Sequence, residues 1–419
     1  MPNRRSFIRQ TAALLGGLAL HHTEAAAYAL PQPPRLPKGP EDDFWRQVRQ
    51  AYASSPTLIN LNNGGVCPAP RAAMDALDYY NRMCNEAPSY YMWRILDQDR
   101  EPLRENLAAL AGADPEEIAI NRNATEALNT IIFGLNLKAG DEVVLSKYDY
   151  PNMINAWKQR EKRDGIRLVW VDLELPSEDG EYLSQAFISK FTDKTKIVHV
   201  THMINWCGQI LPVRRIADAA HARGIEVLCD AAHSFALLDY KISDLGCDYM
   251  GTSLHKWLCA PFGNGLLWIR KEKIPQVWAL LSNDKPDGDN IRKFESLGTR
   301  NFAVEMATGY SLDLHNLIGS RRKQERIYFL KNYWMERVAD VPGIQFFTPR
   351  SSAWSCAIGV FGLPDKKPAE LSDLLLTNHK IHTTGIEWEK IKGVRVTPNV
   401  YTTTEDLDKL VGAIRKIAK

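Results

Sequence analysis

The sequence predicts an α/β protein with a large, doubly wound, mostly parallel sheet domain and a smaller C-terminal α+β domain. The chain has 419 residues, more than one ordinary core holds. From about residue 72 to residue 271, short apolar runs alternate with amphipathic stretches, which is typical of strands and helices wound about a parallel sheet. We expect an N-terminal segment over residues 30–70, the large domain over residues 71–300 and the small domain over residues 301–419.

The expected elements follow one another with short loops rich in glycine and aspartate. Strands are predicted over residues 117–121, 142–146, 167–173, 196–202, 225–230, 249–252 and 265–269. Helices are predicted over residues 125–135, 151–163, 181–191 and 213–223, and a long helical stretch over residues 303–337. We also expect residues 41–70 to pack against the small domain.

The N-terminus has the pattern of a targeting segment. Arg4 and Arg5 precede an apolar run over residues 12–20, and small residues around position 27 offer a cleavage site. Residues 1–29 resemble a twin-arginine export signal, and the alternative is a basic amphipathic starter helix. We therefore expect a periplasmic protein, and no later run approaches the ~20 apolar residues that would anchor it in a membrane after cleavage.

Composition narrows the classes of partner. Hydrophobic residues make up 45% of the chain, charged residues 24%, and the formal charge is +2, so no basic excess points to nucleic acid. Small molecules are the expected partners. The seven cysteines are irregularly spaced and lack the paired spacing of a zinc site, so we expect buried thiols and no metal site.

Asp230 and Lys256 form the most informative pair of residues in the sequence. Asp230 ends an apolar strand, and Lys256 follows the next predicted strand. Open α/β sheets bind ligands at the carboxyl ends of their strands. A lysine in a dry site suits Schiff-base chemistry, and a facing aspartate suits a cationic pyridinium nitrogen, which together indicate pyridoxal phosphate. The alternative is a surface lysine and a strand-end aspartate with no common ligand.

Three further features fall on the same edge of the predicted sheet. Asn123 and Thr125 lie where a strand joins a helix, whose first N–H groups would receive a phosphate, although plain N-capping explains them too. Tyr150 follows another strand and offers an aromatic face to a planar ring. Asn205 is a polar group past a fourth strand. Their convergence favours a site.

These motifs together resemble the class V aminotransferase family of fold type I pyridoxal phosphate (PLP)-dependent transferases. The resemblance spans nearly all of residues 57–415 and rests on the following segments: Asn123-Ala124-Thr125-Glu126, Tyr150, Asn205, Asp230-Ala231-Ala232-His233, Ser253-Leu254-His255-Lys256 and Gly298-Thr299-Arg300. Within that family, Ile59-Asn60-Leu61-Asn62-Asn63-Gly64-Gly65 most resembles the isopenicillin N epimerase group.

The resemblance implies a role for each of these residues toward pyridoxal 5′-phosphate. Lys256 is expected to bind the cofactor aldehyde and to act as acid and base, Asp230 to pair with the ring nitrogen and His233 to reach the phenolic oxygen. Tyr150 is expected to stack on the ring. The residues expected to hold the phosphate are Ala124, Thr125, Ser253 and His255, with Gly298 and Thr299 contributed by the partner subunit of a homodimer.

The resemblance also implies a substrate clamp. Arg395 matches the arginine that binds a substrate carboxylate through its planar fork, with Asn205 in support at the cofactor and Asn63 near the substrate. The expected reaction takes place at the α-carbon of an amino acid or peptide-like amine and is an epimerisation or a transamination. Loss of a β or γ substituent and a non-catalytic binding protein of the same fold remain alternatives.

Two other classes fit the sequence less well. Cysteine desulfurases of the family carry a nucleophilic cysteine shortly before the clamping arginine, and residues 378–392 contain none. A dinucleotide-binding enzyme would need a glycine-rich turn after its first strand, and residues 121–127 contain no glycine.

Overall fold

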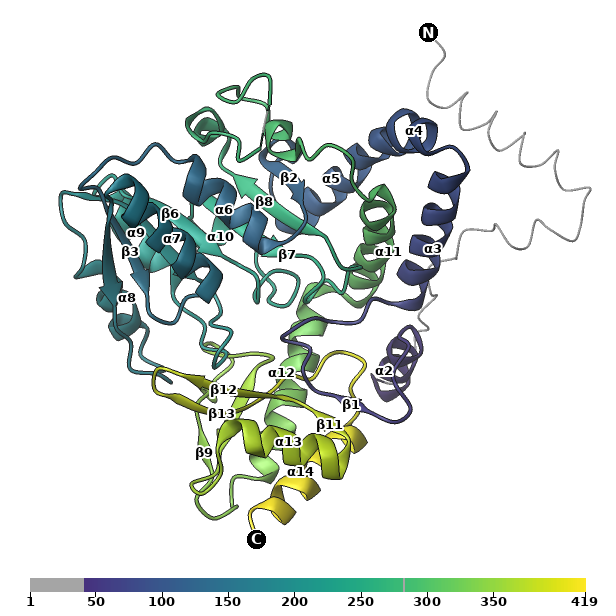
Figure 1. Cartoon of the computed structure of the whole chain (residues 1–419). Helices are drawn as coiled ribbons and strands as arrows, with labels where there is room; N and C mark the ends of the chain where they lie inside the picture. Colours follow the sequence, from purple (N-terminus) through teal and green to yellow (C-terminus); the bar gives the residue numbers. More distant parts are fainter. Residues whose placement is uncertain (1–40, 282) are drawn as a thin grey trace, which may run out of the picture.

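The computed structural model describes residues 41–281 and 283–419, and the predicted export signal over residues 1–29 lies outside the described residues. A large domain carries a seven-stranded sheet, and a smaller domain below it in Figure 1 carries a four-stranded sheet. The helix α12 (Ser320–Arg337) runs from one domain into the other. None of the described helices is both long and apolar enough to cross a membrane.

The large sheet confirms the predicted doubly wound, mostly parallel architecture. Its strand order is β2-β8-β7-β6-β5-β3-β4, and β8 alone of these runs antiparallel to both of its neighbours. The strands are β2 (Ile118–Asn121), β3 (Glu142–Ser146), β4 (Arg167–Val171), β5 (Thr195–Thr201), β6 (Glu226–Asp230), β7 (Tyr249–Ser253) and β8 (Gly265–Ile269). Each predicted strand of this domain is therefore present within a few residues of its expected bounds.

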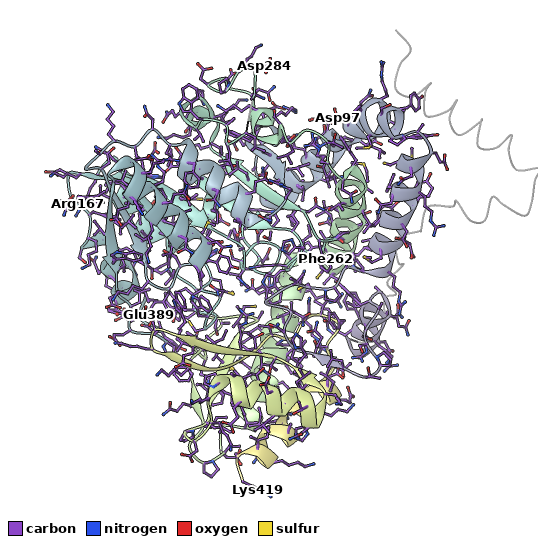
Figure 2. The ribbon with its side chains drawn as sticks, in the orientation of Figure 1. Asp97, Arg167, Phe262, Asp284, Glu389 and Lys419 are labelled. Carbon is purple, nitrogen blue, oxygen red and sulfur yellow. The ribbon has the colours of Figure 1, made fainter. Side chains whose placement is uncertain are left out.

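Helices cover both faces of this sheet, which explains why its strands read as continuous apolar runs. In β3, Val143 and Leu145 join one buried cluster while Val144 joins the other, so successive side chains enter opposite cores. One cluster includes residues of α6 (Ala124–Gly134) and α7 (Pro151–Asp164), and the other includes residues of α5 (Asp97–Ala111), α8 (Gly180–Ile188) and α9 (Val213–His221). Figure 2 shows side chains filling the space between these layers.

The helical stretch expected over residues 303–337 is two helices, α11 (Phe302–Ile318) and α12. They are separated by Gly319, whose φ of +86° lies in the left-handed region that glycine tolerates. The helix α11 packs on α3 (Arg71–Glu86) and α5 of the large domain. The domain boundary at residue 300 stays a prediction, although α11 lies with the large domain.

The small domain has its own core between a sheet and helices. Its strands, in the order β12-β13-β10-β9, are β12 (Thr384–Trp388), β13 (Ile391–Val396), β10 (Gly359–Gly362) and β9 (Gln345–Phe346), packed with α13 (Pro368–His379) and α14 (Thr404–Ile417). The N-terminal segment adds β1 (Ile59–Asn60), which pairs in parallel with β11 (Ile381–His382). Residues 41–70 thus contact the small domain as expected.

Short elements complete the described chain. They are α2 (Glu41–Gln50), α4 (Pro88–Tyr90), the π-helical turn η2 (Tyr91–Leu96), α10 (Ile242–Leu245) and the 3₁₀ turns η3 (Pro115–Glu117), η4 (Lys271–Gln276) and η5 (Ile291–Glu295).

A buried ionic cluster ties η5 to β2 and α5. The carboxylate of Glu295 accepts hydrogen bonds from Arg104 Nη1 at 2.6 Å, from Arg100 Nη2 at 2.8 Å and from the backbone N–H of Ile120 at 2.6 Å. Both arginines and Glu295 are buried. Removing one partner of a buried ion pair leaves uncompensated charge, so this cluster is sensitive to substitution.

We therefore predict that Glu295→Ala lowers the free energy of unfolding by ~3–5 kcal/mol, because Arg100 and Arg104 each lose a buried carboxylate partner and keep Glu305 and Glu101, respectively, as their nearest remaining carboxylates. The matched control is Glu116→Ala, which removes a partly exposed carboxylate from Arg292 and should cost less than ~1 kcal/mol. Urea denaturation followed by circular dichroism measures both. Equal denaturation midpoints for the two variants would show that the buried cluster stabilises the fold no more than the exposed Glu116–Arg292 pair does.

Candidate active site

A cavity of about 390 Å³ opens where the carboxyl ends of the large-sheet strands face the small domain. It brings together ten of the residues predicted from the sequence. These are Ala124, Thr125, Tyr150, Asn205, Asp230, His233, Ser253, His255, Lys256 and Arg395. Residues from both domains therefore line one cavity, as the strand-end argument predicted for those of the large sheet.

The floor of the cavity at one end is the N-terminus of α6. Asn123 caps this helix, since its Oδ1 accepts the N–H of Glu126 at 2.9 Å, and Ser253 Oγ accepts the N–H of Ala124 at 2.9 Å. Thr125 and His255 line the cavity beside them. Free N–H groups and hydroxyls at a helix N-terminus suit an anion such as a phosphate.

Asp230 is buried at the end of β6, at the middle of the sheet edge. Its Oδ1 accepts the N–H of Ala232 at 2.9 Å. Burial raises the pKa of this carboxyl, and the nearby Lys256 acts in the opposite direction. A cationic group in the cavity would therefore stabilise the ionised form of Asp230.

Lys256 lies in the loop after β7, and its Nζ is 2.8 Å from Nε2 of His233. Burial lowers the pKa of Lys256 to about 8, with Asp230 opposing that shift. Burial, and then the charge of Lys256, holds the pKa of His233 well below its usual range. The imidazole is consequently neutral near pH 7. The Lys256 ammonium also lies 6.0 Å from the centre of the Tyr150 ring.

Arg395 enters the cavity from β13 of the small domain. Its Nη1 donates to the backbone carbonyl of Asn205 at 3.0 Å, and its Nη2 donates to Oδ1 of Asn62 at 3.2 Å. Its Nε has no hydrogen-bond partner among the described residues. Burial lowers the pKa of Arg395 to about 10, so it stays protonated at neutral pH. The oriented guanidinium keeps N–H groups for a carboxylate.

Three predicted residues lie elsewhere. Asn63 is fully buried outside the cavity lining: its Nδ2 donates to Thr397 O at 2.8 Å and its Oδ1 accepts from Tyr401 Oη at 2.6 Å, and its expected contact with substrate stays a prediction. Its neighbour Asn62 contacts the clamp instead. Gly298 and Thr299 do not line this cavity, and their expected role in a partner subunit stays a prediction.

The sequence reasoning missed several lining residues. Trp206 follows Asn205 directly, and its ring stacks on Trp388 of β12 with centroids 4.7 Å apart and planes at 11°. Trp388 in turn donates its Nε1–H to Lys147 O at 2.9 Å. Ile386 adds a second apolar side chain from β12. The position of Trp206 next to Asn205 could have identified it as a cavity residue, whereas nothing in the sequence around Ile386 indicates that it lines the cavity.

The residues fit the expected cofactor. Five buried polar atoms of the lining have no hydrogen-bond partner among the described residues, namely Asn205 Oδ1, Trp206 Nε1, His233 Nδ1, His255 Nδ1 and Arg395 Nε. They share the cavity with an amine, a carboxylate and a helix N-terminus. A planar ring with an aldehyde, a basic nitrogen and a phosphate matches this donor and acceptor set. Lys256, Asp230 and the α6 N-terminus would hold those three groups.

A comparison with protein families shows which family has this fold. The family model "Aminotransferase class-V" matches residues 59–410. The chain belongs to the class-V aminotransferase family. The membership confirms the predicted family and fold type, and with them the prediction of a PLP-dependent enzyme.

Relatives with curated names carry two activities. The chain is 30% identical to an isopenicillin N epimerase of Streptomyces clavuligerus, over 88% of this chain and 97% of that protein. It is 27% identical to an isopenicillin N epimerase of Amycolatopsis lactamdurans, over 90% and 99%. It is also 26% identical to a probable cysteine desulfurase of Halalkalibacterium halodurans, over 86% and 93%.

Solved structures share the fold. The cysteine desulfurase of Thermococcus onnurineus superimposes with a TM-score of 0.78 at 21% identity, covering 92% of this chain and 98% of that one. A mutant of C-DES with glycine linked covalently to its PLP cofactor also has a TM-score of 0.78, at 20% identity, covering 88% and 99%. These identities establish the fold and leave the reaction open.

We predict that PLP attaches to the cofactor-free protein with a rate that rises through about pH 8, because only the neutral amine of Lys256 attacks the aldehyde and its pKa is about 8. An ordinary lysine would titrate near pH ~10.4. Stopped-flow absorbance across pH measures the midpoint.

The variant Asp230→Asn provides the control for this assignment. Asp230 raises the pKa of Lys256, so its neutralisation should move the midpoint to lower pH. A midpoint that stays near that of free lysine in the wild-type protein would contradict the environment assigned to Lys256.

Proposed function

We propose that the protein acts at the α-carbon of an amino acid or a peptide-like amine whose carboxylate binds Arg395, and that it is an epimerase or an aminotransferase. One observation carries the proposal. The partly buried amine of Lys256 and the buried guanidinium of Arg395 face the same cavity from different domains. A substrate clamped at Arg395 by its carboxylate would present its amine and its α-carbon between these two groups.

The residues divide the work among themselves. When bound, PLP supplies an aldehyde that captures an amine and a ring that withdraws electrons from the α-carbon. Lys256 Nζ takes the α-proton, since a pKa of about 8 leaves roughly a tenth of this amine neutral at pH 7, far more than for an ordinary lysine. His233 Nε2, at 2.8 Å, orients Nζ and shares its proton. Asp230 would stabilise a positive charge on the ring nitrogen of the bound cofactor.

Both domains contribute apolar side chains to the cavity wall. Trp206, from the loop after β5, and Ile386, from β12, line the cavity, and Trp388 of β12 stacks on Trp206. An apolar wall strengthens the electrostatic contacts of Arg395 and Lys256 inside the cavity.

The choice of reaction rests on the relatives and on the residues present. Epimerases are the relatives at 30% and 27% identity. No cysteine is among the described residues that line the cavity, which disfavours a desulfurase. Elimination of a β or γ substituent begins with the same proton transfer, so it depends on the substrate carrying a leaving group.

Export and dimerisation belong to the same proposal. Arg4 and Arg5 support twin-arginine export of the folded protein with its cofactor to the periplasm.

Phe262, labelled in Figure 2, is 67% exposed and lines a surface hollow together with Leu297 and Thr299. An exposed aromatic side chain beside Thr299 supports a homodimer in which this loop reaches the partner's phosphate site.

We predict that Arg395→Ala weakens binding of the substrate carboxylate by roughly tenfold to a hundredfold, because charge-assisted hydrogen bonds are lost. The measurement is exchange of the α-proton in D₂O for a panel of amino acids and dipeptides, read by NMR. KM should rise while the cofactor absorbance stays, and Arg395→Lys should recover part of the loss because a point charge cannot reproduce the fork.

The control for charge removal is Arg167→Ala, an exposed arginine at the start of β4 far from the cavity lining. It should leave KM unchanged. If Arg395→Ala exchanges the α-proton of its carboxylate substrates as well as the wild type does, the clamp lies elsewhere.

A further inference from the structure

Two buried thiols contact the chain around Lys256, and the proposed chemistry uses neither of them. Cys67 lies in the N-terminal segment, and Cys259 lies three residues after Lys256. Each of the two cysteines is 1% exposed. The backbone N–H of Cys67 donates to the carbonyl of His255 at 3.1 Å, and that of Cys259 donates to the carbonyl of Lys256 at 3.0 Å. Both cysteines are therefore bonded to the loop that carries the cofactor lysine.

The two sulfur atoms share one amide group. Nδ2 of Asn399 lies 3.2 Å from Sγ of Cys67 and 3.4 Å from Sγ of Cys259, so its N–H groups donate to both sulfurs. The two cysteine side chains are also hydrogen-bonded to each other. Both are free thiols. The fold thus brings into contact two cysteines that are far apart in the sequence.

The groups around the pair favour a thiolate on Cys259. The hydrogen bond with Cys67, and then the positive charge of Lys323 on α12, lower the pKa of Cys259 against the effect of its burial. The amide of Asn399 and the hydroxyl of Tyr52 act in the same direction. Burial, and then the hydrogen bond with Cys259, raises the pKa of Cys67. A thiolate and a thiol therefore face each other, which is the arrangement that thiol oxidation requires.

A second buried thiol pair has the opposite chemistry. Cys229 of β6 is hydrogen-bonded to Cys247, and this contact, burial and the charge of Asp230 all raise the pKa of Cys229. Cys229 therefore stays a thiol near neutral pH. This pair provides an internal comparison, because it has the same proximity without the groups that stabilise a thiolate.

The backbone at Cys259 is strained. Its φ of +59° lies in the left-handed region, which is unfavourable for a residue with a Cβ. The carbonyl of Cys259 accepts a hydrogen bond from Ser311 Oγ of α11 at 3.0 Å, and its N–H closes the turn to Lys256. Such a conformation persists only where surrounding contacts hold it. A displacement of Cys259 would therefore move the turn that carries Lys256.

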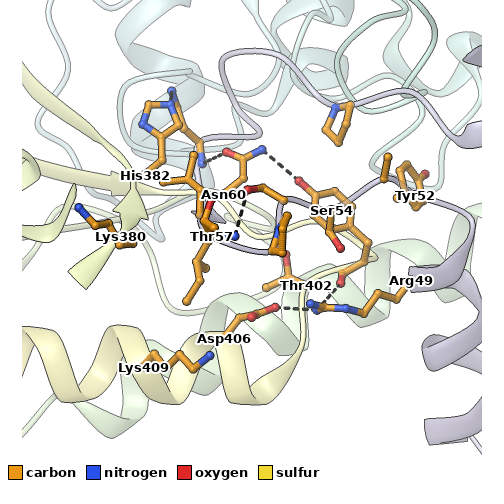
Figure 3. A pocket seen from close by; sticks show the side chains of 18 of the residues that line it. Arg49, Tyr52, Ser54, Thr57, Asn60, Lys380, His382, Thr402, Asp406 and Lys409 are labelled. Atoms are coloured by element: carbon orange, nitrogen blue, oxygen red, sulfur yellow. Dashed lines mark hydrogen bonds and ion pairs between the residues drawn. The ribbon is translucent and has the colours of Figure 1, made fainter. Parts of the chain in front are cut away.

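A cavity of about 810 Å³ between the N-terminal segment and α14 gives small molecules a route toward the pair (Figure 3). It adjoins the active site, because Val66 lines both cavities. Val66 and Pro68 lie on either side of Cys67 in the chain, and both line it. Tyr52, labelled in Figure 3, lines the cavity and is also hydrogen-bonded to Cys259. A molecule in this cavity is thus one side chain away from the sulfur of Cys259.

We propose that Cys67 and Cys259 form a site of reversible oxidation, at which a peroxide converts the two thiols into a disulfide. The Cys259 thiolate attacks one peroxide oxygen, which breaks the O–O bond, releases hydroxide and leaves a sulfenic acid on Cys259. The Cys67 thiol then attacks that sulfur, so that the S–S bond forms and the sulfenic oxygen leaves as water. The sulfurs lose two electrons, and the peroxide gains them.

The disulfide would alter the surroundings of Lys256. A covalent bond requires the two sulfurs to approach more closely than a hydrogen bond does, so Cys259 and the N-terminal segment must move toward each other. The turn from Lys256 to Cys259 would shift with them, together with the stretch that carries Asn62. A displacement of ~1 Å can change a rate on the order of a hundredfold. The oxidation itself does not depend on which reaction the enzyme catalyses.

Peptide mapping of the holoenzyme tests the site without any substrate. Treatment with hydrogen peroxide, followed by digestion and mass spectrometry without reductant, should yield the peptides of Cys67 and Cys259 joined by a disulfide. A reductant should separate them again, and Cys229 and Cys247 should remain thiols. The absence of a link between Cys67 and Cys259, or a faster link between Cys229 and Cys247, overturns the proposal.

Substitutions assign the two roles within the pair. In Cys67→Ser the sulfenic acid has no thiol partner, so dimedone should trap it on Cys259, whereas Cys259→Ser should give no dimedone adduct on Cys67. The matched control is Cys247→Ala, which should form the Cys67–Cys259 disulfide as fast as the wild type does. Trapping on Cys67 in Cys259→Ser would overturn the assigned order of attack.

Release of PLP from the holoenzyme by hydroxylamine measures the effect on Lys256. Hydroxylamine carries no carboxylate, so its reaction does not depend on Arg395 or on the proposed substrate. The release rates of the oxidised and the reduced wild type should differ by roughly tenfold, and peroxide should leave the rate of Cys259→Ser unchanged. Equal rates for the oxidised and reduced wild type overturn the link to Lys256. Failure of the Arg395 prediction, by contrast, would refute the proposed function alone.

Discussion

Lys256 and Arg395 bring two positive charges into one buried cavity, and Asp230 is the carboxylate that faces them at the sheet edge. Burial disfavours the charged forms of both cations, which lowers the pKa of Lys256 to about 8 and that of Arg395 to about 10. The cavity is therefore prepared for ligands that bring negative charge. A phosphate at the α6 N-terminus and a carboxylate at Arg395 would each supply negative charge. The lowered pKa of Lys256 also makes its neutral amine available near physiological pH.

The clamp depends on contacts that cross from one part of the chain to another. Arg395 comes from the small domain, Asn205 from the loop after β5, and Asn62 from the N-terminal segment. The contact with Asn205 uses its backbone carbonyl, so the local chain path matters more than the side chain. The pairing of β1 with β11 holds the N-terminal segment against the small domain, and thereby sets the position of Asn62 beside the guanidinium.

The residues at the strand ends were predictable because each directly follows a short apolar run that the local sequence already marks as a strand. Asp230 closes an apolar strand, and Ser253 closes the next one, so the parallel sheet itself brings Asp230, Ser253 and Lys256 together. The contacts of the small domain were not predictable in this way. Nothing in the sequence around Asn62 distinguishes it from Asn63, because both are polar and the register of β1 against β11 decides which one meets Arg395.

The division of residues 303–337 into two helices has a similar origin. The pattern on both sides of Gly319 is helical, and a single glycine inside a helical pattern is a weak signal. The break follows from tertiary packing, because α11 lies on α3 and α5 while α12 must enter the small domain. The cavity beside the active site was equally invisible, since its walls come from segments more than 300 residues apart, as the Arg49–Asp406 pair shows.

The most direct test of this account is to reduce the holoenzyme with borohydride and to locate the pyridoxyl group by peptide mass spectrometry. Lys256 is the lysine that lines the cavity with Asp230, His233 and the α6 N-terminus, so we predict the modification on Lys256 and its loss in Lys256→Ala. A stable pyridoxyl group on a different lysine of the wild-type protein would contradict the assignment of this cavity as the active site.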